Sequence, residues 1–454
     1  MSDTDFDVII VGAGGAGLAA AIEASAAGAR VLLVEAGTRP GGSTAMSGGV
    51  VYAAGTSLQR KAGVIDDWES MYRYYLHINQ FKLDPALVRR LCHDAAPAFE
   101  WLLSMGVGFE EDGLYPSGID RIRRGHRARE RGAGITEALE GALAGKSVEI
   151  ALNSRVQALV TEGGRVTGIR IDGEVVTSRA VVLTTGGFGA NRDMLAQLYP
   201  SAAAEGDLAW YIGTPHAQGD ALSMTRALGA GVTRADRGLL LLTPGWAKEL
   251  ETYLPPWLML VGSDGRRFVD EASEYSILAE LMTEMPGREC YAIFDEAARA
   301  VAKSKDAPNW NADSLQRLIG AGQIARGDTL GDLAARLGID ATILTASAER
   351  ICRAAATGED AQFFKDPAHL RPIATAPYYG ARIRAAIVCW TGTGLRIDPE
   401  ARVLGPADAP IPGLFAAGEA TGGMFGPCYA GGGASIGNAL VFGRIAGRNA
   451  ARRV

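Results

Sequence analysis

The sequence predicts an α/β protein in which a Rossmann-like nucleotide-binding domain is interrupted by a smaller, inserted α+β domain. A strand, the turn GAGGAG and an alanine-rich helix open the chain, and the strand RVLLVE follows. Two further apolar strands that end in glycine, AVVLTTGG and GLFAAGEATGG, come much later. Between them the glycine pattern fades and helical stretches such as ATILTASAERICRAAAT appear. We therefore expect a nucleotide-binding domain made of residues 1–240 and 368–454, with a cap domain inserted at 241–367.

The composition is that of a globular protein and argues against several classes of partner. Of 454 residues, 48% are apolar and 21% charged, and the net charge is −6. This charge disfavours nucleic acid or an anionic membrane surface as the main partner. The five cysteines lie far apart without a CxxC motif, which disfavours disulfides and iron–sulfur clusters. Because no secretory signal, membrane-spanning stretch or metal-spaced histidine pair is visible, we expect a cytoplasmic protein without a metal.

The N-terminal strand–turn–helix–strand unit has the pattern of a dinucleotide site. A strand at Val8 to Val11 leads into Gly12, Gly14 and Gly17, which occupy the GxGxxG positions before a helix that runs to about Ala27. Glycines there let the backbone approach a pyrophosphate at the helix N-terminus. Glu35 ends the next strand, where it can accept hydrogen bonds from a ribose. The alternative reading is a tight strand-to-helix turn without a ligand.

NAD and FAD share this first unit, and three later segments favour FAD. RPGGSTAMSGG is a second glycine-rich loop, suited to wrapping a longer dinucleotide. A stretch that alternates like a β-meander then returns through AVVLTTGG, and Glu419 ends a later strand where a flavin ribityl chain would lie. This order is typical of glutathione-reductase-like FAD domains. The further residues expected to bind FAD are Gly41, Gly42, Ser43, Thr44, Gly48, Gly49, Gly186 and Gly187. The early glycine loop contains no histidine that could form a covalent link to the flavin, since the first histidine of the chain is His77. We therefore expect FAD to be non-covalent.

Several motifs together resemble one flavoprotein family. They are DVIIVGAGGAGLAAAIEA, GGSTAMSGG, RRGHRARERGAGITEAL, AVVLTTGGFGANRDM, SDGRRFVDE and GLFAAGEATGGMFG. The chain is similar over nearly its whole length to the family of soluble fumarate reductases and ketosteroid dehydrogenases. The resemblance implies an FAD domain and a mobile cap, with the substrate between them over the flavin. His126, within the third motif, is expected to have a structural or cofactor-contacting role.

The resemblance also identifies where this chain departs from the fumarate reductases. Those proteins use an arginine acid, a histidine and a second arginine, at positions that correspond here to Tyr275, Trp390 and Tyr429. A dicarboxylate in a dry pocket requires such cations. Their proton-relay glutamate corresponds to Glu251, but its partner arginine corresponds to Leu254. These replacements predict an uncharged, largely apolar substrate.

The ketosteroid dehydrogenases resemble this chain at the replaced positions. They have a tyrosine corresponding to Tyr275, and their C-terminal loop matches Tyr429, Gly431 and Gly433. The resemblance implies that the Tyr429 hydroxyl and the Gly433 N–H hold a ketone oxygen, while Tyr275 removes the α-proton. Tyr115 corresponds loosely to an assisting tyrosine.

The rest of the C-terminal loop is expected to serve the substrate and the flavin. Trp390, Gly431 and Gly432 would line the substrate pocket. A helix beginning at Ser435–Ile436 would point its N-terminus at the flavin and favour the anionic reduced ring.

The sequence thus predicts an FAD-dependent enzyme that introduces a double bond beside a ring ketone, of the 3-ketosteroid or cyclohexanone type. The electrons would go to an external acceptor. One alternative is an ene-reductase that runs the reverse reaction on an uncharged enone, and another is a non-catalytic flavin-binding module. For single residues, the structural alternatives are Tyr429 as an aromatic wall on the flavin and Tyr275 as a core tyrosine of the cap.

Overall fold

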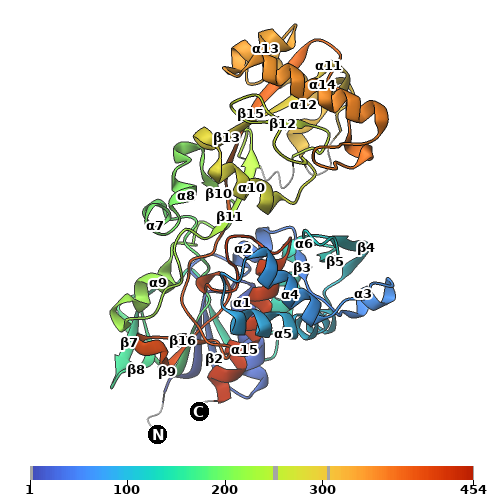
Figure 1. Cartoon of the computed structure of the whole chain (residues 1–454). Helices are drawn as coiled ribbons and strands as arrows, with labels where there is room; N and C mark the ends of the chain where they lie inside the picture. The colour runs from blue at the N-terminus through green and yellow to red at the C-terminus, as the bar shows by residue number, and fades with distance from the viewer. Residues whose placement is uncertain (1–3, 249–253, 304–306, 453–454) are drawn as a thin grey trace. The chain divides into compact units, whose positions relative to one another are not determined.

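A computed structural model of the protein describes residues 4–248, 254–303 and 307–452. The chain divides into two compact units. Unit 1 contains residues 1–200, 211–239 and 389–454, and unit 2 contains residues 201–210 and 240–388. Unit 2 runs past the expected return of the chain at residue 368, because strand β15 (Tyr378–Thr391) pairs with β13 (Glu289–Asp295) and β14 (Ala325–Gly327) of that unit. Figure 1 shows the order of the elements.

The main sheet of unit 1 is built around strand β1. Its strand order is β16-β17-β9-β1-β2-β6, and β1 pairs in parallel with both β2 and β9. Val8, Ile9 and Ile10 are fully buried, as expected for a central parallel strand covered on both faces. The strands are β1 (Phe6–Val11), β2 (Val31–Val34), β6 (Val148–Ala151), β9 (Glu174–Leu183), β16 (Arg402–Leu404) and β17 (Pro410–Ala416). The expected Rossmann-like α/β fold is thereby confirmed.

The predicted meander is also present. Strands β7 (Val156–Glu162), β8 (Arg165–Ile171) and β9 pair in antiparallel order, and β9 then continues into the parallel sheet beside β1. A separate three-stranded antiparallel sheet has the order β3-β5-β4, from β3 (Val50–Tyr52), β4 (Phe109–Pro116) and β5 (Arg123–Ala128). This small sheet supports the C-terminal loop described below.

Two helices, far apart in the sequence, pack tightly together in unit 1. They are α1 (Gly15–Ala26) and α15 (Ala434–Arg452), drawn blue and red in Figure 1. A Cβ atom at Gly443 would lie 2.5 Å from the carbonyl oxygen of Ala16, so a side chain there would separate the helices. The other main helices of this unit are α2 (Gly42–Met46), α3 (Ser57–Lys61), α4 (Trp68–Ile78), α5 (Pro85–Ser104), α6 (Arg131–Gly141), α7 (Arg192–Leu198) and α9 (Asp220–Thr225).

Unit 2 has the α+β character expected of the inserted domain. Strand β15 is the centre of its sheet and pairs with β10 (Trp210–Tyr211), β11 (Gly238–Thr243), β13 and β14, and β13 pairs with β12 (Met259–Val261). The predicted helix ATILTASAERICRAAAT forms α14 (Ala341–Thr357), which buries Leu344 and Ile351 against Met259 of the sheet core. The remaining helices are α10 (Tyr275–Glu284), α11 (Glu296–Ala300), α12 (Ala312–Gly320) and α13 (Leu330–Leu337).

Candidate active site

The expected phosphate loop joins β1 to α1 and admits only glycine at two positions. Gly12 has a φ of 103°, and a Cβ at Gly17 would lie 1.8 Å from the Gly12 carbonyl oxygen. Gly14 is the N-cap of α1 and, as a glycine, places no side chain of its own at the helix N-terminus. This arrangement suits the close approach of a phosphate to the backbone.

The second glycine loop lies directly against the first. Gly14 and Gly41 form a parallel bridge, and the Gly41 N–H donates to the Ala13 carbonyl over 2.8 Å. Thr44 Oγ1 accepts the N–H of Gly15 at the start of α1 over 3.3 Å. The first two of the four expected dinucleotide-binding segments are therefore brought together at the N-terminus of α1, as a wrapped dinucleotide requires.

Four other predicted residues of the second loop have different environments. Gly42 has a φ of 51° and its Cβ would lie 3.3 Å from Gly14 Cα, so it belongs to the same close junction. Ser43 Oγ accepts the Thr214 N–H and contacts Tyr211 Oη within unit 1. Gly49, with a φ of 67°, packs against the start of α6, whereas a Cβ at Gly48 would meet nothing within 4 Å.

Glu35 lies buried beside the first loop. Its Oε2 accepts the Ala13 N–H over 2.8 Å and its Oε1 accepts the Gly37 N–H over 2.7 Å. Each carboxylate oxygen has a second lone pair, so these bonds leave capacity for ribose hydroxyls. The carboxylate therefore shapes the loop and keeps acceptors for a ligand.

Glu419 is the second carboxylate of the expected FAD site, and it lies beside Thr391 and Gly187. Its Oε1 accepts from the Thr391 N–H over 2.9 Å and from the Thr391 hydroxyl over 2.8 Å. A Cβ at Gly187 would lie 1.9 Å from Thr391 Oγ1 and 2.5 Å from Glu419 Oε1, and neighbouring Gly186 has a φ of 74°. No described residue donates to Oε2, and burial raises the pKa of Glu419 to about 7. An acceptor so placed fits a polyol chain, so the residues of unit 1 fit FAD.

The C-terminal glycine loop is packed against the small β3-β5-β4 sheet. A Cβ at Gly431 would lie 2.3 Å from the Ser117 carbonyl oxygen, and one at Gly433 would lie 2.6 Å from the Val50 carbonyl oxygen. The Gly432 N–H donates to the Ser117 carbonyl over 3.2 Å, while the Gly433 N–H has no acceptor among the described residues. Protein packing alone thus requires two of these glycines.

Tyr429 lies at the start of this loop and is buried. Its hydroxyl accepts the N–H of Ser435 over 2.8 Å, so a donor of the first turn of α15 is directed at Tyr429. Ser435 and the buried Ile436 both lie in this first turn. The Tyr429 ring is 6.0 Å from Trp390 and 5.2 Å from Phe425, centroid to centroid. Trp390 and Phe425 pack edge-on at 4.8 Å, so the three rings form one aromatic cluster.

Tyr275 belongs to unit 2, where it opens helix α10 and is 5% exposed. Before it, Glu274 caps the helix: its Oε2 accepts the Ser276 N–H over 2.7 Å and the Ser276 hydroxyl over 2.5 Å. The other oxygen, Oε1, is buried without a hydrogen-bond partner among the described residues. Burial raises the pKa of Glu274 to about 7. Glu251 lies outside the described residues, and Leu254 is buried.

Tyr115 and Tyr52 lie on opposite sides of the same central strand. Tyr115 of β4 and Tyr52 of β3 both face Gly125 of β5 in the register. Tyr115 packs under the Arg127 guanidinium at 5.1 Å, whereas the Tyr52 ring edge lies beside Gly431. Tyr52 therefore contacts the C-terminal loop. The sequence around it, VVYAAG, resembles an ordinary strand and did not predict this contact.

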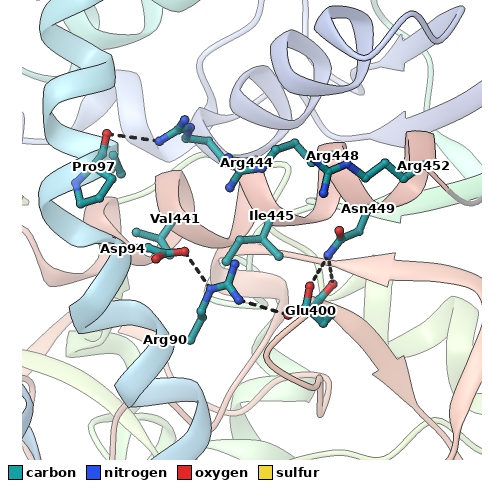
Figure 2. A pocket seen from close by; sticks show the side chains of 11 residues that line it. Arg90, Asp94, Pro97, Glu400, Val441, Arg444, Ile445, Arg448, Asn449 and Arg452 are labelled. Carbon is teal, nitrogen blue, oxygen red and sulfur yellow. Dashed lines mark hydrogen bonds and ion pairs between the residues drawn. The ribbon is translucent and has the colours of Figure 1, made fainter.

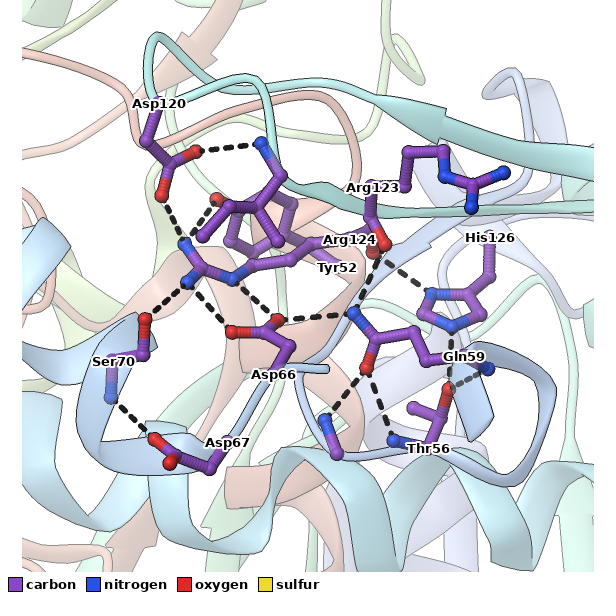
Figure 3. A network of polar contacts seen from close by, with 12 residues as sticks. Tyr52, Thr56, Gln59, Asp66, Asp67, Ser70, Asp120, Arg123, Arg124 and His126 are labelled. Carbon is purple, nitrogen blue, oxygen red and sulfur yellow. Dashed lines mark hydrogen bonds and ion pairs between the residues drawn. The ribbon is translucent and has the colours of Figure 1, made fainter. Parts of the chain in front are cut away.

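A buried polar network lies behind Tyr52 and includes His126 (Figure 3). Arg124 is fully buried and pairs with Asp66 over 2.8 Å and with Asp120 over 2.7 Å. His126 Nδ1 faces the Arg124 carbonyl at 2.8 Å and Nε2 faces Thr56 Oγ1 at 2.8 Å. Burial lowers the pKa of His126 to about 4, so it is neutral near pH 7. Both ring nitrogens are occupied by protein partners, as in a structural histidine.

A cavity of about 370 Å³ lies between α5 and the C-terminal half of α15, away from the glycine loops (Figure 2). Arg90 pairs there with Asp94 over 2.7 Å and with Glu400 over 3.1 Å. Arg444, on the same wall, pairs with Glu23. The cavity contains none of the predicted site residues.

In the described parts of the chain, no helix is long and apolar enough to cross a membrane. Within the same residues, no group of three or more histidine, cysteine, aspartate or glutamate side chains is arranged to hold a metal ion.

Comparison with known proteins gives the family. Residues 7–436 match the family described as FAD binding domain. The chain is 30% identical to the fumarate reductase (cytochrome) of Shewanella frigidimarina, over 98% of its own length and 77% of that protein. It is 25% identical to the 4-oxocyclohexanecarboxylate 2-dehydrogenase of Sinomonas cyclohexanicum, over 98% of its own length and 93% of that protein.

Comparison with solved structures gives the same family. The 3-ketosteroid-Δ4-(5α)-dehydrogenase of Rhodococcus jostii RHA1, solved with 4-androstene-3,17-dione, superposes with a TM-score of 0.82 and 27% identity, covering 99% of this chain and 98% of that one. The chain spans about half the length, 48%, of the NADH:fumarate oxidoreductase of Klebsiella pneumoniae, to which it is 30% identical. These relatives are FAD oxidoreductases that act on CH–CH groups. The chain belongs to the FAD binding domain family and, within it, to the FAD-dependent oxidoreductases that include the fumarate reductases and ketosteroid dehydrogenases.

Proposed function

We propose that the protein dehydrogenates an uncharged ring ketone, introducing a double bond between the carbons α and β to the carbonyl. The observation that carries the proposal is the buried cluster of Tyr429, Trp390 and Phe425. In the fumarate reductases that the chain resembles, the first two of these positions are cationic. An aromatic cluster favours an apolar ring, whereas a dicarboxylate left there without guanidinium partners would lose its hydration uncompensated.

The proposed chemistry uses a few groups of this chain. The Tyr429 hydroxyl, which accepts from Ser435, would donate to the ketone oxygen together with the Gly433 N–H. Donors fixed in advance stabilise the enolate that forms when the α-proton leaves. Tyr275 would remove that proton. FAD, when bound, supplies the acceptor for the hydride that leaves the β-carbon. The reduced cofactor must then be reoxidised by an external electron acceptor.

The relatives support this proposal unequally. The Sinomonas protein is named as a dehydrogenase of a ring ketone that also carries a carboxylate, and the Rhodococcus structure contains an uncharged steroid ketone. The fumarate reductases show higher sequence identity than either. Overall identity reflects the whole FAD scaffold, whereas substrate charge is decided by a few side chains. For that reason we base the proposed substrate class on the replaced cationic residues rather than on overall sequence identity. The ring size of the substrate stays open between a steroid and a cyclohexanone.

An ene-reductase is the second candidate, because the same site would catalyse the reverse reaction. Several relatives are named reductases, which favours this direction. It would take an uncharged enone or another activated alkene. A non-catalytic flavin-binding module is the third candidate, and it would have no need of either tyrosine.

The first experiment is anaerobic mixing of the purified yellow protein with single compounds, followed by absorbance of the oxidised flavin. The compounds are a saturated 3-ketosteroid, a Δ4-3-ketosteroid, cyclohexanone, a carboxylated cyclohexanone and succinate. Bleaching by an uncharged ketone supports the proposal and indicates the ring size. Bleaching by succinate alone would contradict it. If only chemically reduced protein reacts, and with an enone, the protein is an ene-reductase.

Two variants test the residues. Tyr429→Phe removes one donor to the ketone oxygen and is expected to lower kcat by roughly 10²–10³-fold, as in other oxyanion sites. Tyr275→Phe removes the proposed base and should lower it by roughly 10²–10⁴-fold. Both variants should keep their FAD. Unchanged turnover in both would exclude these roles.

A further inference from the structure

The segment that carries Tyr429 has no regular structure of its own. Between the short turn Gly418–Ala420 and the start of α15 at Ala434, the described chain forms neither helix nor strand. Its position therefore depends on hydrogen bonds from other elements. The end of helix α4, whose partners lie more than three hundred residues away in the sequence, supplies several of them.

Asn79, the C-cap residue that directly follows α4, holds the segment before Tyr429. Asn79 is fully buried, and its Oδ1 accepts the N–H groups of Gly426 and Cys428, both over 2.9 Å. Its Nδ2 donates to the Tyr75 carbonyl over 3.1 Å. Because both loop partners are donors, the amide can have only this orientation.

Tyr74 holds the segment after Tyr429. Its hydroxyl donates to the Ala430 carbonyl over 2.8 Å and accepts the Ile119 N–H over 2.9 Å. Cys428 and Ala430, which flank Tyr429, are thus each hydrogen-bonded to a residue of α4 or its C-cap. The Tyr429 hydroxyl itself is bonded to Ser435 of α15.

We propose that Asn79 and Tyr74 are positioning residues that hold the Tyr429 hydroxyl in place for the substrate, an inference that rests on the proposed function. Neither residue needs to touch the substrate. Anchoring on both sides restricts the backbone of residue 429, and the hydrogen bond from the Ser435 N–H then holds the Tyr429 hydroxyl. A displacement of about 1 Å in a reacting group lowers a rate by roughly a hundredfold. Loss of one anchor should therefore reduce kcat while the binding of FAD persists.

The chain offers a matched control in the next residue. Tyr75 is also fully buried and packs on Phe425 at 5.9 Å, but its hydroxyl has no hydrogen-bond partner among the described residues. Tyr74→Phe and Tyr75→Phe delete the same atom from neighbouring buried tyrosines. Only the first deletion releases the loop. A difference between the two variants therefore reports the anchor rather than general core packing.

The test uses the FAD-loaded full chain and three measurements. These are kcat and KM for the ketone that bleaches the wild type, FAD content, and amide hydrogen exchange of peptides covering residues 423–434. Tyr74→Phe is expected to lower kcat by roughly 10- to 100-fold, with unchanged FAD content and faster exchange in this segment. Tyr75→Phe should match the wild type in all three measurements. Equal kcat and equal exchange in the two variants would overturn the proposal.

Two further variants, Asn79→Ala and Tyr429→Phe, complete the design. Asn79→Ala removes the acceptor of the Gly426 and Cys428 amides, so exchange of these amides should accelerate even where turnover is too slow to measure. Unchanged exchange there would contradict the anchoring role of Asn79. Tyr429→Phe separates this inference from the proposed function. If no ketone bleaches the wild type, the proposed function has failed, and if Tyr429→Phe keeps full turnover, the proposed role of the Tyr429 hydroxyl has failed. If Tyr429→Phe is inactive while Tyr74→Phe behaves like Tyr75→Phe, only the anchor has failed.

Discussion

Two partly buried glutamates, Glu274 and Glu419, have a pKa raised by desolvation to about 7, and they differ in how their oxygens are bonded. Glu419 has one oxygen that accepts two hydrogen bonds from Thr391, and its other oxygen receives no hydrogen bond from the described residues. Glu274 has one oxygen bonded twice by Ser276 and the other buried without a partner. An ionised carboxylate in the second environment is poorly solvated, so it should lower the stability of the folded protein wherever it carries charge.

The first prediction concerns Glu274→Gln and the pH dependence of stability. The folded-state pKa is about 7, above the ordinary value of 4.5 for a glutamate, so between these pH values the folded state binds more protons than the unfolded state. The contribution of Glu274 to the free energy of unfolding therefore falls as pH rises from about 4.5 to 7. Glu274→Gln should be more stable than wild type by roughly 1–3 kcal/mol at pH 8, with the gain vanishing near pH 4.5.

Chemical denaturation at several pH values measures this difference. The control is Glu284→Gln, at an exposed position that ends the same helix α10, which should change stability little at any pH. A gain for Glu274→Gln that is constant across pH, or no gain at pH 8, would contradict the prediction.

At the scale of elements, the geometry of the β1–turn–α1 unit tolerates little change. Helix α1 meets the sheet at Gly12 and Gly17, where the helix start touches the preceding turn, and it meets α15 at Gly443. Small residues at each contact bring the backbones close together. The same closeness lets a phosphate reach the helix N-terminus, so packing and cofactor binding depend on one set of glycines.

The second prediction follows from that dependence. In Gly17→Ala the added Cβ would lie 1.8 Å from the Gly12 carbonyl oxygen, so the turn and helix must separate. We expect purified Gly17→Ala to contain less than about a tenth of the wild-type FAD, since close backbone approach to the pyrophosphate is lost. The flavin-to-protein absorbance ratio measures this. Gly141→Ala, at the end of α6 with nothing within 4 Å of the new Cβ, should keep full FAD content.

At the scale of the whole molecule, FAD binding and the cap are assigned to different units. The residues expected to contact FAD, from Gly12 to Gly49 and then Gly187 and Glu419, all belong to unit 1. Tyr275 belongs to unit 2, which has its own sheet and hydrophobic core. The chain also returns twice to unit 1, so this unit is assembled from three separate segments that a ligand could hold together.

The third prediction is that FAD selectively stabilises unit 1. A ligand that binds only the folded state at a thousand times its Kd adds about 4 kcal/mol to stability. Scanning calorimetry of the apoprotein with increasing FAD should show two transitions, of which one moves to higher temperature while the other stays. A single transition, or two that rise together, would show that the units unfold cooperatively. Excess riboflavin, which lacks the pyrophosphate and adenosine, is the control and should shift neither transition comparably.

The local features of this protein were readable from the sequence. GAGGAG between an apolar strand and a helix predicted the turn at Gly12, Gly14 and Gly17, because the motif is contiguous and Gly17 packs directly against the Gly12 carbonyl of the same turn. The helix α14 follows its apolar periodicity over the whole predicted range. FAD and the family likewise followed from short motifs in a fixed order.

What only the tertiary structure decided are contacts between residues distant in the chain. The anchors of Tyr429 on Tyr74 and Asn79, the Thr391 bonds to Glu419 and the place of Tyr52 beside Gly431 have no local signature. The expected end of the cap at residue 367 lies short of Val388, where unit 2 ends, because the pairing of β15 with β13 cannot be read from either strand alone. The glycine run after Tyr429 indicated close approach to its backbone. Only the folded chain showed that the Ser117 and Val50 carbonyls occupy that space, since one sequence records which positions must be small but not what lies against them.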